Sequence, residues 1–252
     1  MHTHGNLPLQ QNLVARDPDA PMLAWCSALA LGALLAPGNA RHAPARMQFG
    51  NFKNPFASKT DGATTIALTI GFNVADRGRR SVLDQLDAIA ADADTSTSEG
   101  IARLCGDTSL ALLRRRSEWV SCSGTVAHRG TDDDALLFFD RLAIQEASKF
   151  DDRDSSTTID AALSAAGLGA RSAPPTLAVV CVIGCVMGDR EAQLGGSSFS
   201  GDAARLQTAL QELAAAAEGE VFAFELLWVP GGDDETLDAD AVMIDWPELM
   251  PC

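Results

Sequence analysis

The sequence predicts an α+β fold in which helices cover a single sheet of about four strands, in the order β-α-α-β-α-β-α-β. Two observations favour this class. Short apolar segments rich in β-branched residues alternate with longer segments of helical spacing, and turn residues separate them. Apolar residues make up 46% of the 252 residues, which is sufficient for one well-packed domain and an extension.

Four segments predict strands. The first alternates apolar residues with a period of two, and the third is a continuous apolar run typical of a central strand covered on both faces. Residues 151–175, with one loose helix near 159–166, and residues 188–201 predict loops. The four expected strands are 63–74, 119–127, 176–187 and 221–229.

Four segments predict helices because their apolar residues recur every three or four positions. A Ser-x-x-Glu box from Ser96 to Glu99 is a candidate cap for the second helix, with Ser98 as the alternative. Thr131 and the aspartates after it begin the third helix, and a short acidic helix is expected from Asp238. The four expected helices are 77–93, 96–114, 131–150 and 202–217.

Residues 1–62 are predicted to precede a globular domain that spans 63–252. The uncharged apolar run 22–36 is shorter than the about 20 residues that a membrane-spanning helix needs. Its length is typical of a targeting or anchoring segment, and a short helix packed on the domain is the alternative. Residues 41–62 contain prolines and glycines with little periodicity, which predicts a linker.

The chain carries a net charge of −15, and no Lys or Arg occurs between Glu218 and Cys252. Such a domain repels phosphate backbones, so we expect no nucleic-acid partner. An acidic surface favours solubility or the binding of a basic protein. The interaction surface that we expect comprises Asp233, Asp234, Glu235, Asp238 and Asp240.

Sequence motifs for catalysis and cofactor binding are absent. There is no Cys-x-x-Cys pair, no phosphate-binding glycine loop and no Gly-x-Ser-x-Gly elbow, so we expect no metal, cofactor or catalytic residue. We interpret His128 as a surface imidazole rather than a base. Cys181 and Cys185 predict core thiols, because four positions along a strand separate them by about 13 Å. Cysteine usage indicates a reducing compartment, with a lumen as the alternative.

Three spaced blocks of the sequence carry a resemblance to a known family. The blocks are Leu86–Leu113, which includes the segment ADTSTSEG at 93–100, Phe139–Asp151 (FDRLAIQEASKFD), and Ala223–Thr236 (AFELLWVPGGDDET) with the WPEL segment at Trp246–Leu249. They resemble the domain of unknown function 1517, a family of cyanobacteria, algae and plants, and the resemblance covers about 63–250. Plant members are known as fluctuating-light acclimation proteins of thylakoid and envelope membranes, and no catalytic residues come with the family.

The resemblance implies a non-enzymatic regulatory or interaction protein of the chloroplast, associated with the thylakoid or envelope and linked to photosynthetic acclimation. It would act through protein partners, and residues 22–36 would provide any association with a membrane. Two alternatives stay open: a small hydrolase-like enzyme that uses His128 and a neighbouring acid, and an acidic scaffold that docks a basic partner. The alternative location is the cytoplasm.

Overall fold

The computed structural model describes six ranges of the chain. For the range 41–46 and for residues 151–165 at the end of another range, it describes the backbone alone. The apolar run 22–36 lies outside the described residues, so its expected role in targeting or anchoring stays a prediction. The described ranges are 41–46, 62–74, 81–165, 177–216, 219–231 and 237–252.

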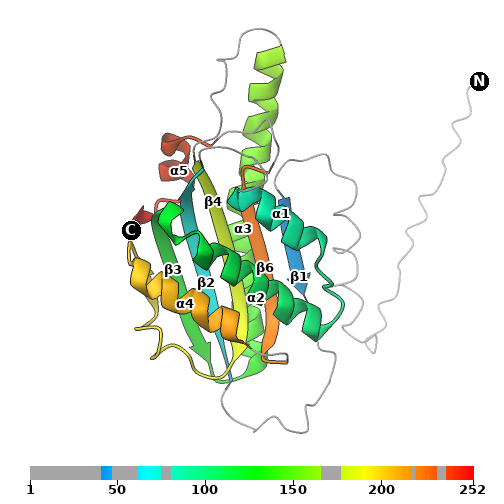
Figure 1. Ribbon diagram of the computed structural model, residues 1–252, viewed down its shortest axis with the longest axis vertical. Coiled ribbons are helices and arrows are strands. Elements are labelled where there is room, and N and C mark those ends of the chain that lie inside the picture. The colour runs from blue at the N-terminus through cyan, green and yellow to red at the C-terminus, as the bar shows by residue number, and fades with distance from the viewer. Residues whose placement is uncertain (1–40, 47–61, 75–80, 166–176, 217–218, 232–236) are drawn as a thin grey trace, which may run out of the picture. The chain divides into compact units, whose positions relative to one another are not determined.

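Within these described ranges, seven strands form one sheet in which every pair is antiparallel (Figure 1). Six of them follow the order β1-β6-β4-β2-β3-β5, and β7 also pairs with β3. The strands are β1 (Arg41–Arg46), β2 (Ala63–Asn73), β3 (Trp119–Arg129), β4 (Leu177–Met187), β5 (Ser198–Ser200), β6 (Val221–Val229) and β7 (Met250–Pro251).

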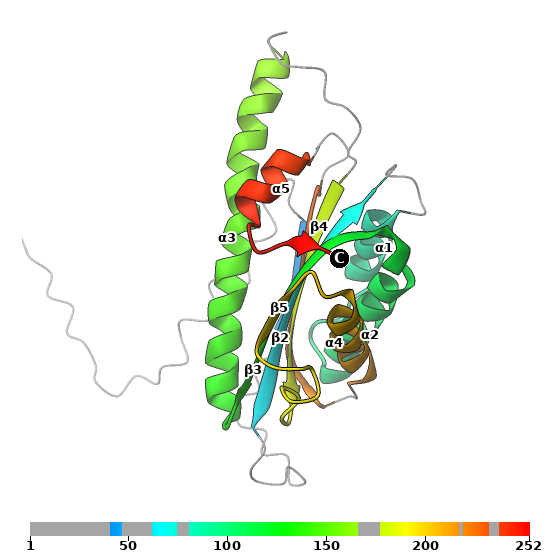
Figure 2. The same cartoon turned by 90° about the vertical axis from the view of Figure 1, so that its left-hand side faces the viewer.

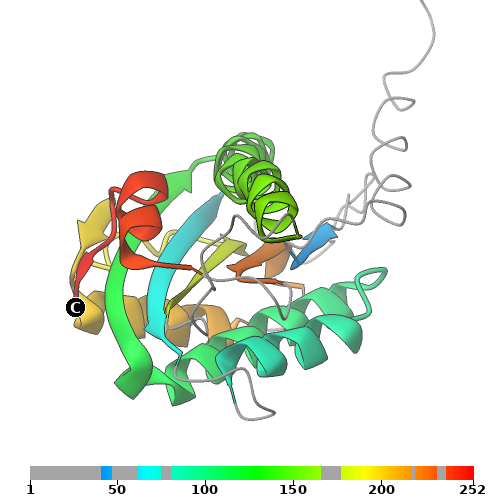
Figure 3. The ribbon, with the colours of Figure 1, turned by 90° about the horizontal axis from the view of Figure 1, so that it is seen from above.

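Helices cover both faces of the sheet. One face is covered by α1, α2 and α4, and the other by α3 and α5, as the side view in Figure 2 and the end view in Figure 3 show. We call these the α1–α2–α4 face and the α3 face. The helices are α1 (Val82–Ala91), α2 (Ser98–Arg114), α3 (Asp132–Ala165), α4 (Ala203–Ala215) and α5 (Ala239–Asp245), with a 3₁₀ turn, η2 (Arg116–Glu118), before β3.

The α1–α2–α4 face is packed with large apolar side chains. Ile66, Leu68, Ile70 and Phe72 alternate along β2 and are fully buried there. The apolar stripes of α1, α2 and α4 lie over them in one continuous cluster. Each such side chain contributes about 1.5–3 kcal/mol through the apolar surface it removes from water.

The α3 face has smaller side chains on its central strands. Thr65, Ala67 and Thr69 alternate along β2 with the large residues of the opposite face. The Thr65 hydroxyl donates a hydrogen bond to the Ala135 carbonyl of α3 at 3.3 Å. Small residues let one helix approach the sheet closely, and Phe139 of α3 is fully buried in this contact.

The α+β class is confirmed, but the expected count of four strands is wrong. The expected order is also incomplete, because it lacks β1, β5 and β7. β1 lies in the expected linker and β5 in the expected loop 188–201. These short strands lack a long alternating pattern, and their pairing with longer neighbours makes them strands.

The expected end of the third helix near Phe150 is also wrong, because α3 continues to Ala165 through much of the expected loop. Residues 151–165 have no apolar stripe that would indicate a helix, but they contain no Pro or Gly to end one. The cap of α2 is Thr97, whose hydroxyl accepts from the Gly100 amide, and neither Ser96 nor Ser98.

Other expected elements are confirmed. β6 has the expected bounds, and β4 lies between β2 and β6 with both of its faces buried. Asp202 caps α4, and the short acidic helix after Asp238 is α5. The sheet therefore places the segment after β6 against α3 and the ends of three strands.

Candidate functional site

A groove of about 440 Å³ lies where β2 ends and where β3 and β4 begin. The strands and the turn after α5 form its floor and wall, and we call it the C-terminal groove. The strand residues that line it are Gly71, Val120, Ser121, Leu177 and Ala178. The C-terminal segment contributes Ala239, Val242, Met243, Trp246, Pro247, Leu249, Met250 and Pro251.

Large apolar side chains of the groove are open to solvent. Met243 is 65% exposed, Met250 52% and Val120 39%. Ile244, next to Met243 on α5, is also exposed. Contiguous exposed apolar side chains on a folded domain mark binding surfaces. The groove therefore has the properties of a docking site for an apolar surface.

Local sequence explains why α5 is held in place. The Asp238 carboxylate accepts a hydrogen bond from the Ala241 amide at 2.8 Å and caps the helix. Trp246 follows the helix and is fully buried. Its ring packs edge-to-face on Phe150 of α3, with 5.2 Å between the ring centroids. Trp246 therefore anchors the segment, while Met243 stays exposed.

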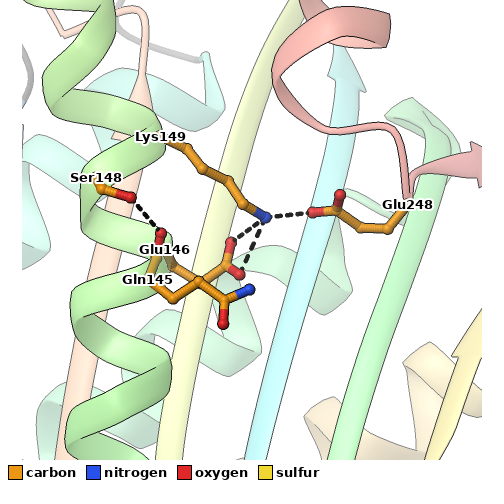
Figure 4. Close-up of polar contacts among 5 residues, drawn as sticks. All are labelled: Gln145, Glu146, Ser148, Lys149 and Glu248. Carbon is orange, nitrogen blue, oxygen red and sulfur yellow. Dashed lines mark hydrogen bonds and ion pairs between the residues drawn. The ribbon is translucent and has the colours of Figure 1, made fainter.

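An ion cluster joins the same segment to α3 (Figure 4). Lys149 of α3 donates to both carboxylate oxygens of Glu146, at 2.9 and 3.0 Å, and to Glu248 at 2.6 Å. Glu248 belongs to the WPEL segment, and Lys149 belongs to the block Phe139–Asp151. The cluster therefore links two family blocks through residues that are 99 positions apart in the sequence. It fixes the turn that forms one wall of the C-terminal groove.

Burial determines the titration of this cluster. Burial raises the pKa of the Glu146 carboxyl above 4.5, although the hydrogen bond from Lys149 acts in the opposite direction. Burial alone would lower the pKa of Lys149, but its hydrogen bonds to Glu248 and Glu146 outweigh that effect and raise the pKa above 10.5. Lys149 is therefore held in its charged form between two carboxylates.

The expected acidic surface falls in two parts. Asp233, Asp234 and Glu235 lie outside the described residues, so their role stays a prediction. Asp238 and Asp240 are exposed in the first turn of α5, on either side of Ala239, which lines the groove. These two acids therefore lie beside the C-terminal groove, and their part in an interaction surface stays a prediction.

The family segment ADTSTSEG forms the turn between α1 and α2. Asp94 accepts hydrogen bonds from the Ser96 amide at 3.0 Å and the Ser96 hydroxyl at 2.6 Å, which lower the pKa of its carboxyl. Thr97 caps α2. A side chain at Gly100 would place its Cβ only 1.8 Å from the Asp94 carbonyl oxygen. These residues are therefore explained by the geometry of a turn.

A second groove, of about 500 Å³, lies beside this turn between α1 and α2. Arg103, the one basic residue of its lining, is already paired: it contacts Asp92 at 3.3 Å and Asp107 at 3.4 Å, and all three side chains are more than half exposed. This groove offers a ligand no buried polar group, and its lining includes no large apolar side chain that is exposed. The C-terminal groove exposes Met243 and Met250, so we favour it as the functional site.

His128 lies near the end of β3, where its half-buried ring has Nδ1 3.5 Å from the Thr64 hydroxyl. Neither His128 nor Arg129 lines either of the two grooves. Neither groove is therefore the pocket that a hydrolase based on His128 would need. Arg129 instead stacks over the Phe138 ring at 4.3 Å. Among the described residues, no group of His, Cys, Asp and Glu is arranged to hold a metal ion.

Cys181 and Cys185 are buried free thiols on the α3 face of β4, as expected. Burial raises the pKa of Cys185 to about 12 and also raises the pKa of Cys181. Reactive cysteines need a thiolate near neutral pH. These two residues therefore act as small apolar side chains.

The residues of the groove were missed by sequence reasoning. Met243 and Met250 look like ordinary apolar residues, because exposure in the folded chain has no local signal. The contact between Lys149 and Glu248 joins positions far apart in the sequence. The one usable signal was the resemblance, since both residues lie in family blocks.

These observations define the class of the protein as an α+β domain built on one antiparallel sheet, with an apolar groove beside its C-terminal segment. The chain belongs to the family described as "Protein of unknown function (DUF1517)", which matches residues 62–252. No solved structure matches it significantly.

Two relatives have descriptive names. The chain is 28% identical over 172 residues to "Protein FLAP1 homolog A" of Synechocystis sp. (strain ATCC 27184 / PCC 6803 / Kazusa), which covers 66% of this chain and 50% of that protein. It is 24% identical over 192 residues to "FLUCTUATING-LIGHT-ACCLIMATION protein 1, chloroplastic" of Arabidopsis thaliana, which covers 76% of this chain and 48% of that protein. The chain therefore spans about half the length of these relatives.

Proposed function

We propose that the chain is a regulatory interaction protein of the plastid that acts in the acclimation of photosynthesis to fluctuating light. The observation that carries the proposal is the C-terminal groove, whose exposed apolar side chains form a docking surface on a domain of this family. The name of the Arabidopsis relative supports the process and the chloroplast location. Thylakoid or envelope association, through residues 22–36, is part of the proposal.

The chain acts by binding rather than by chemistry in this proposal. Trp246 and the Lys149–Glu248 ion pair hold the C-terminal segment in one position, so the groove is formed before a partner arrives. Pre-organisation lowers the entropic cost of binding. A partner that covers Met243, Met250 and Val120 gains about 25 cal/mol for each Å² of apolar surface removed from water.

None of the helices that the structure describes is both long and apolar enough to cross a bilayer. In this proposal the described domain makes the protein contacts, and residues 22–36 provide any association with a membrane.

A domain exchange tests the proposal. Arabidopsis plants that lack the fluctuating-light-acclimation protein receive the Arabidopsis protein with its matching region replaced by residues 62–252 of this chain. We expect chlorophyll fluorescence under fluctuating light to return to the wild-type response. The same exchange with Met243→Asp is expected to fail, because the charge opposes docking in the groove. A fully folded chimera that never restores the response would refute the proposed function.

A further inference from the structure

We propose that the C-terminal groove binds an amphipathic helix of a partner protein, with apolar residues on one face and Lys or Arg beside them. This inference deepens the proposed function and rests on it, because it names the kind of partner that the docking site accepts. Three features carry it: the apolar lining with its two methionines, the paired backbone of the floor, and the acidic residues on α5.

The lining is apolar and adaptable. None of the lining residues is charged, and the volume of about 440 Å³ lies within the range of ligand sites, about 300–1,000 Å³. Met243 of α5 and Met250 of β7 both line the groove and are both more than half exposed. Methionine is unbranched and polarizable, so methionine-lined grooves repack around the apolar face of different helices.

The backbone of the floor favours a helix over a strand. Gly71 of β2 is paired with Ser121 of β3 on one side and Val179 of β4 on the other, so the floor presents no strand edge at Gly71. β7, which also lines the groove, has two residues, and one of these is Pro251, which has no N–H to donate. A partner must therefore be recognised through its side chains.

The charge around the groove favours a basic partner. Asp238 and Asp240 are exposed in the first turn of α5, and no Lys or Arg occurs from Glu218 to Cys252. Lys149, which approaches the segment from α3, is paired with Glu146 and Glu248. Carboxylates beside an apolar groove attract flanking Lys or Arg and repel anionic lipid surfaces. The groove therefore fits a helix of a protein better than a membrane.

Two labelled peptides test this inference with the full chain. Both have about 18 residues, or five helical turns, and the same leucine face at helical spacing. One has lysines on its polar face and the other has glutamates. Binding is measured by fluorescence anisotropy at about 50 mM and about 500 mM NaCl. Met243→Asp is the test variant, and Leu137→Asp is the matched control, because Leu137 of α3 is also 65% exposed and lies outside the groove.

We expect the lysine peptide to bind at least about tenfold more tightly than the glutamate peptide, with weaker binding at high salt. Met243→Asp should weaken binding by about tenfold or more, and Leu137→Asp should leave it unchanged. Equal binding of the two peptides overturns the basic partner. Absence of binding, or binding that Met243→Asp leaves unchanged, overturns the helix site. Binding to vesicles of anionic phospholipid in place of the peptides overturns the choice of a protein partner.

The domain exchange separates the two failures. If neither peptide binds but the Met243→Asp chimera fails where the unaltered chimera succeeds, the proposed function stands and the helix partner is wrong. If the lysine peptide binds as expected but the unaltered chimera fails, the docking site stands and the proposed function is wrong.

Discussion

The two faces of the sheet are covered in different ways. Three helices close the α1–α2–α4 face over large side chains such as Phe72 and Phe224, and together they bury one continuous apolar cluster. The α3 face is covered by one long helix and by the segment that follows β6. That segment leaves Met243 and Met250 exposed beside a groove. The first face stabilises the fold, and the second retains an apolar surface for a partner.

The difference shows how a small domain can be stable and still expose a binding surface. Trp246 and Leu237 of the C-terminal segment are buried against the α3 face and fix its position. Met243, between them in sequence, is not needed for that contact. Mutations on the two faces should therefore separate stability from binding.

The largest expected loss of stability comes from a mutation on the α1–α2–α4 face. Phe224→Ala removes a fully buried ring from β6 and leaves a cavity below α2, so we expect the free energy of unfolding to fall by about 3–5 kcal/mol. Urea denaturation followed by circular dichroism measures this loss. A loss below about 1 kcal/mol would show that this face is loosely packed and would remove the contrast between the faces.

Substitutions at two glycines of α2 test how the turn before this helix supports the α1–α2–α4 face. Gly100→Ala forces a Cβ against the Asp94 carbonyl, and we expect a loss of about 2 kcal/mol as the turn shifts. The control is Gly106→Ala, whose nearest neighbour would be 3.8 Å away. We expect it to gain about 0.5–1 kcal/mol from helix propensity. Thermal unfolding measures both changes. A gain of stability for Gly100→Ala together with a loss for Gly106→Ala would contradict the role of the turn.

The ion cluster of the α3 face should show in the pH dependence of stability. Lys149→Met leaves the buried Glu146 carboxylate without its cation, so we expect a loss of about 1–2 kcal/mol at pH 7. The pKa of Lys149 is raised on folding, so its contribution is present below pH 10.5 and is lost as the pH rises through its folded value. The difference between variant and wild type should therefore narrow above pH 10.5.

The acid side of the same profile follows from Glu146. Its pKa is raised on folding, so its own contribution is complete below pH 4.5 and declines as the pH rises through the folded value. The cost of Lys149→Met should therefore also shrink towards pH 4, where Glu146 is protonated. Urea titrations at a series of pH values test this. Arg103→Met, which breaks an exposed ion pair, is the control and should change stability by at most about 0.5 kcal/mol.

The smallest expected effect on stability is at the groove. Met243→Asp replaces a side chain that is 65% exposed, so we expect the free energy of unfolding to change by at most about 0.5 kcal/mol. Leu137→Asp should behave in the same way in thermal unfolding. A loss of several kcal/mol for Met243→Asp alone would mean that this side chain supports the fold and is not reserved for a partner.

Much of the fold could be predicted because its long elements carry their own patterns. The alternation of Ile66 to Phe72 identified β2, and the β-branched run at 177–187 identified the central strand. β1, β5 and β7 were missed because strand formation there depends on pairing with β6 and β3. The extension of α3 past Phe150 was missed because its polar sequence shows no stripe.

The candidate site was less accessible to sequence reasoning. Acidic composition directed attention to Asp238 and Asp240, which do lie beside the groove. The groove itself combines residues from the ends of three strands with α5 and the segment after it. That combination depends on the order of strands in the sheet, which no local pattern shows. The family segment ADTSTSEG was the clearest motif, and the structure explains it as a turn.

Hydrogen–deuterium exchange of the full chain, with and without the lysine peptide, tests the central claim most directly. The account predicts that added peptide slows exchange in residues 239–251 and at the start of β3 around Val120, with little change in α1 and α2. Slower exchange confined to α1, α2 and the turn between them would contradict the account, because it would place the docking surface on the α1–α2–α4 face.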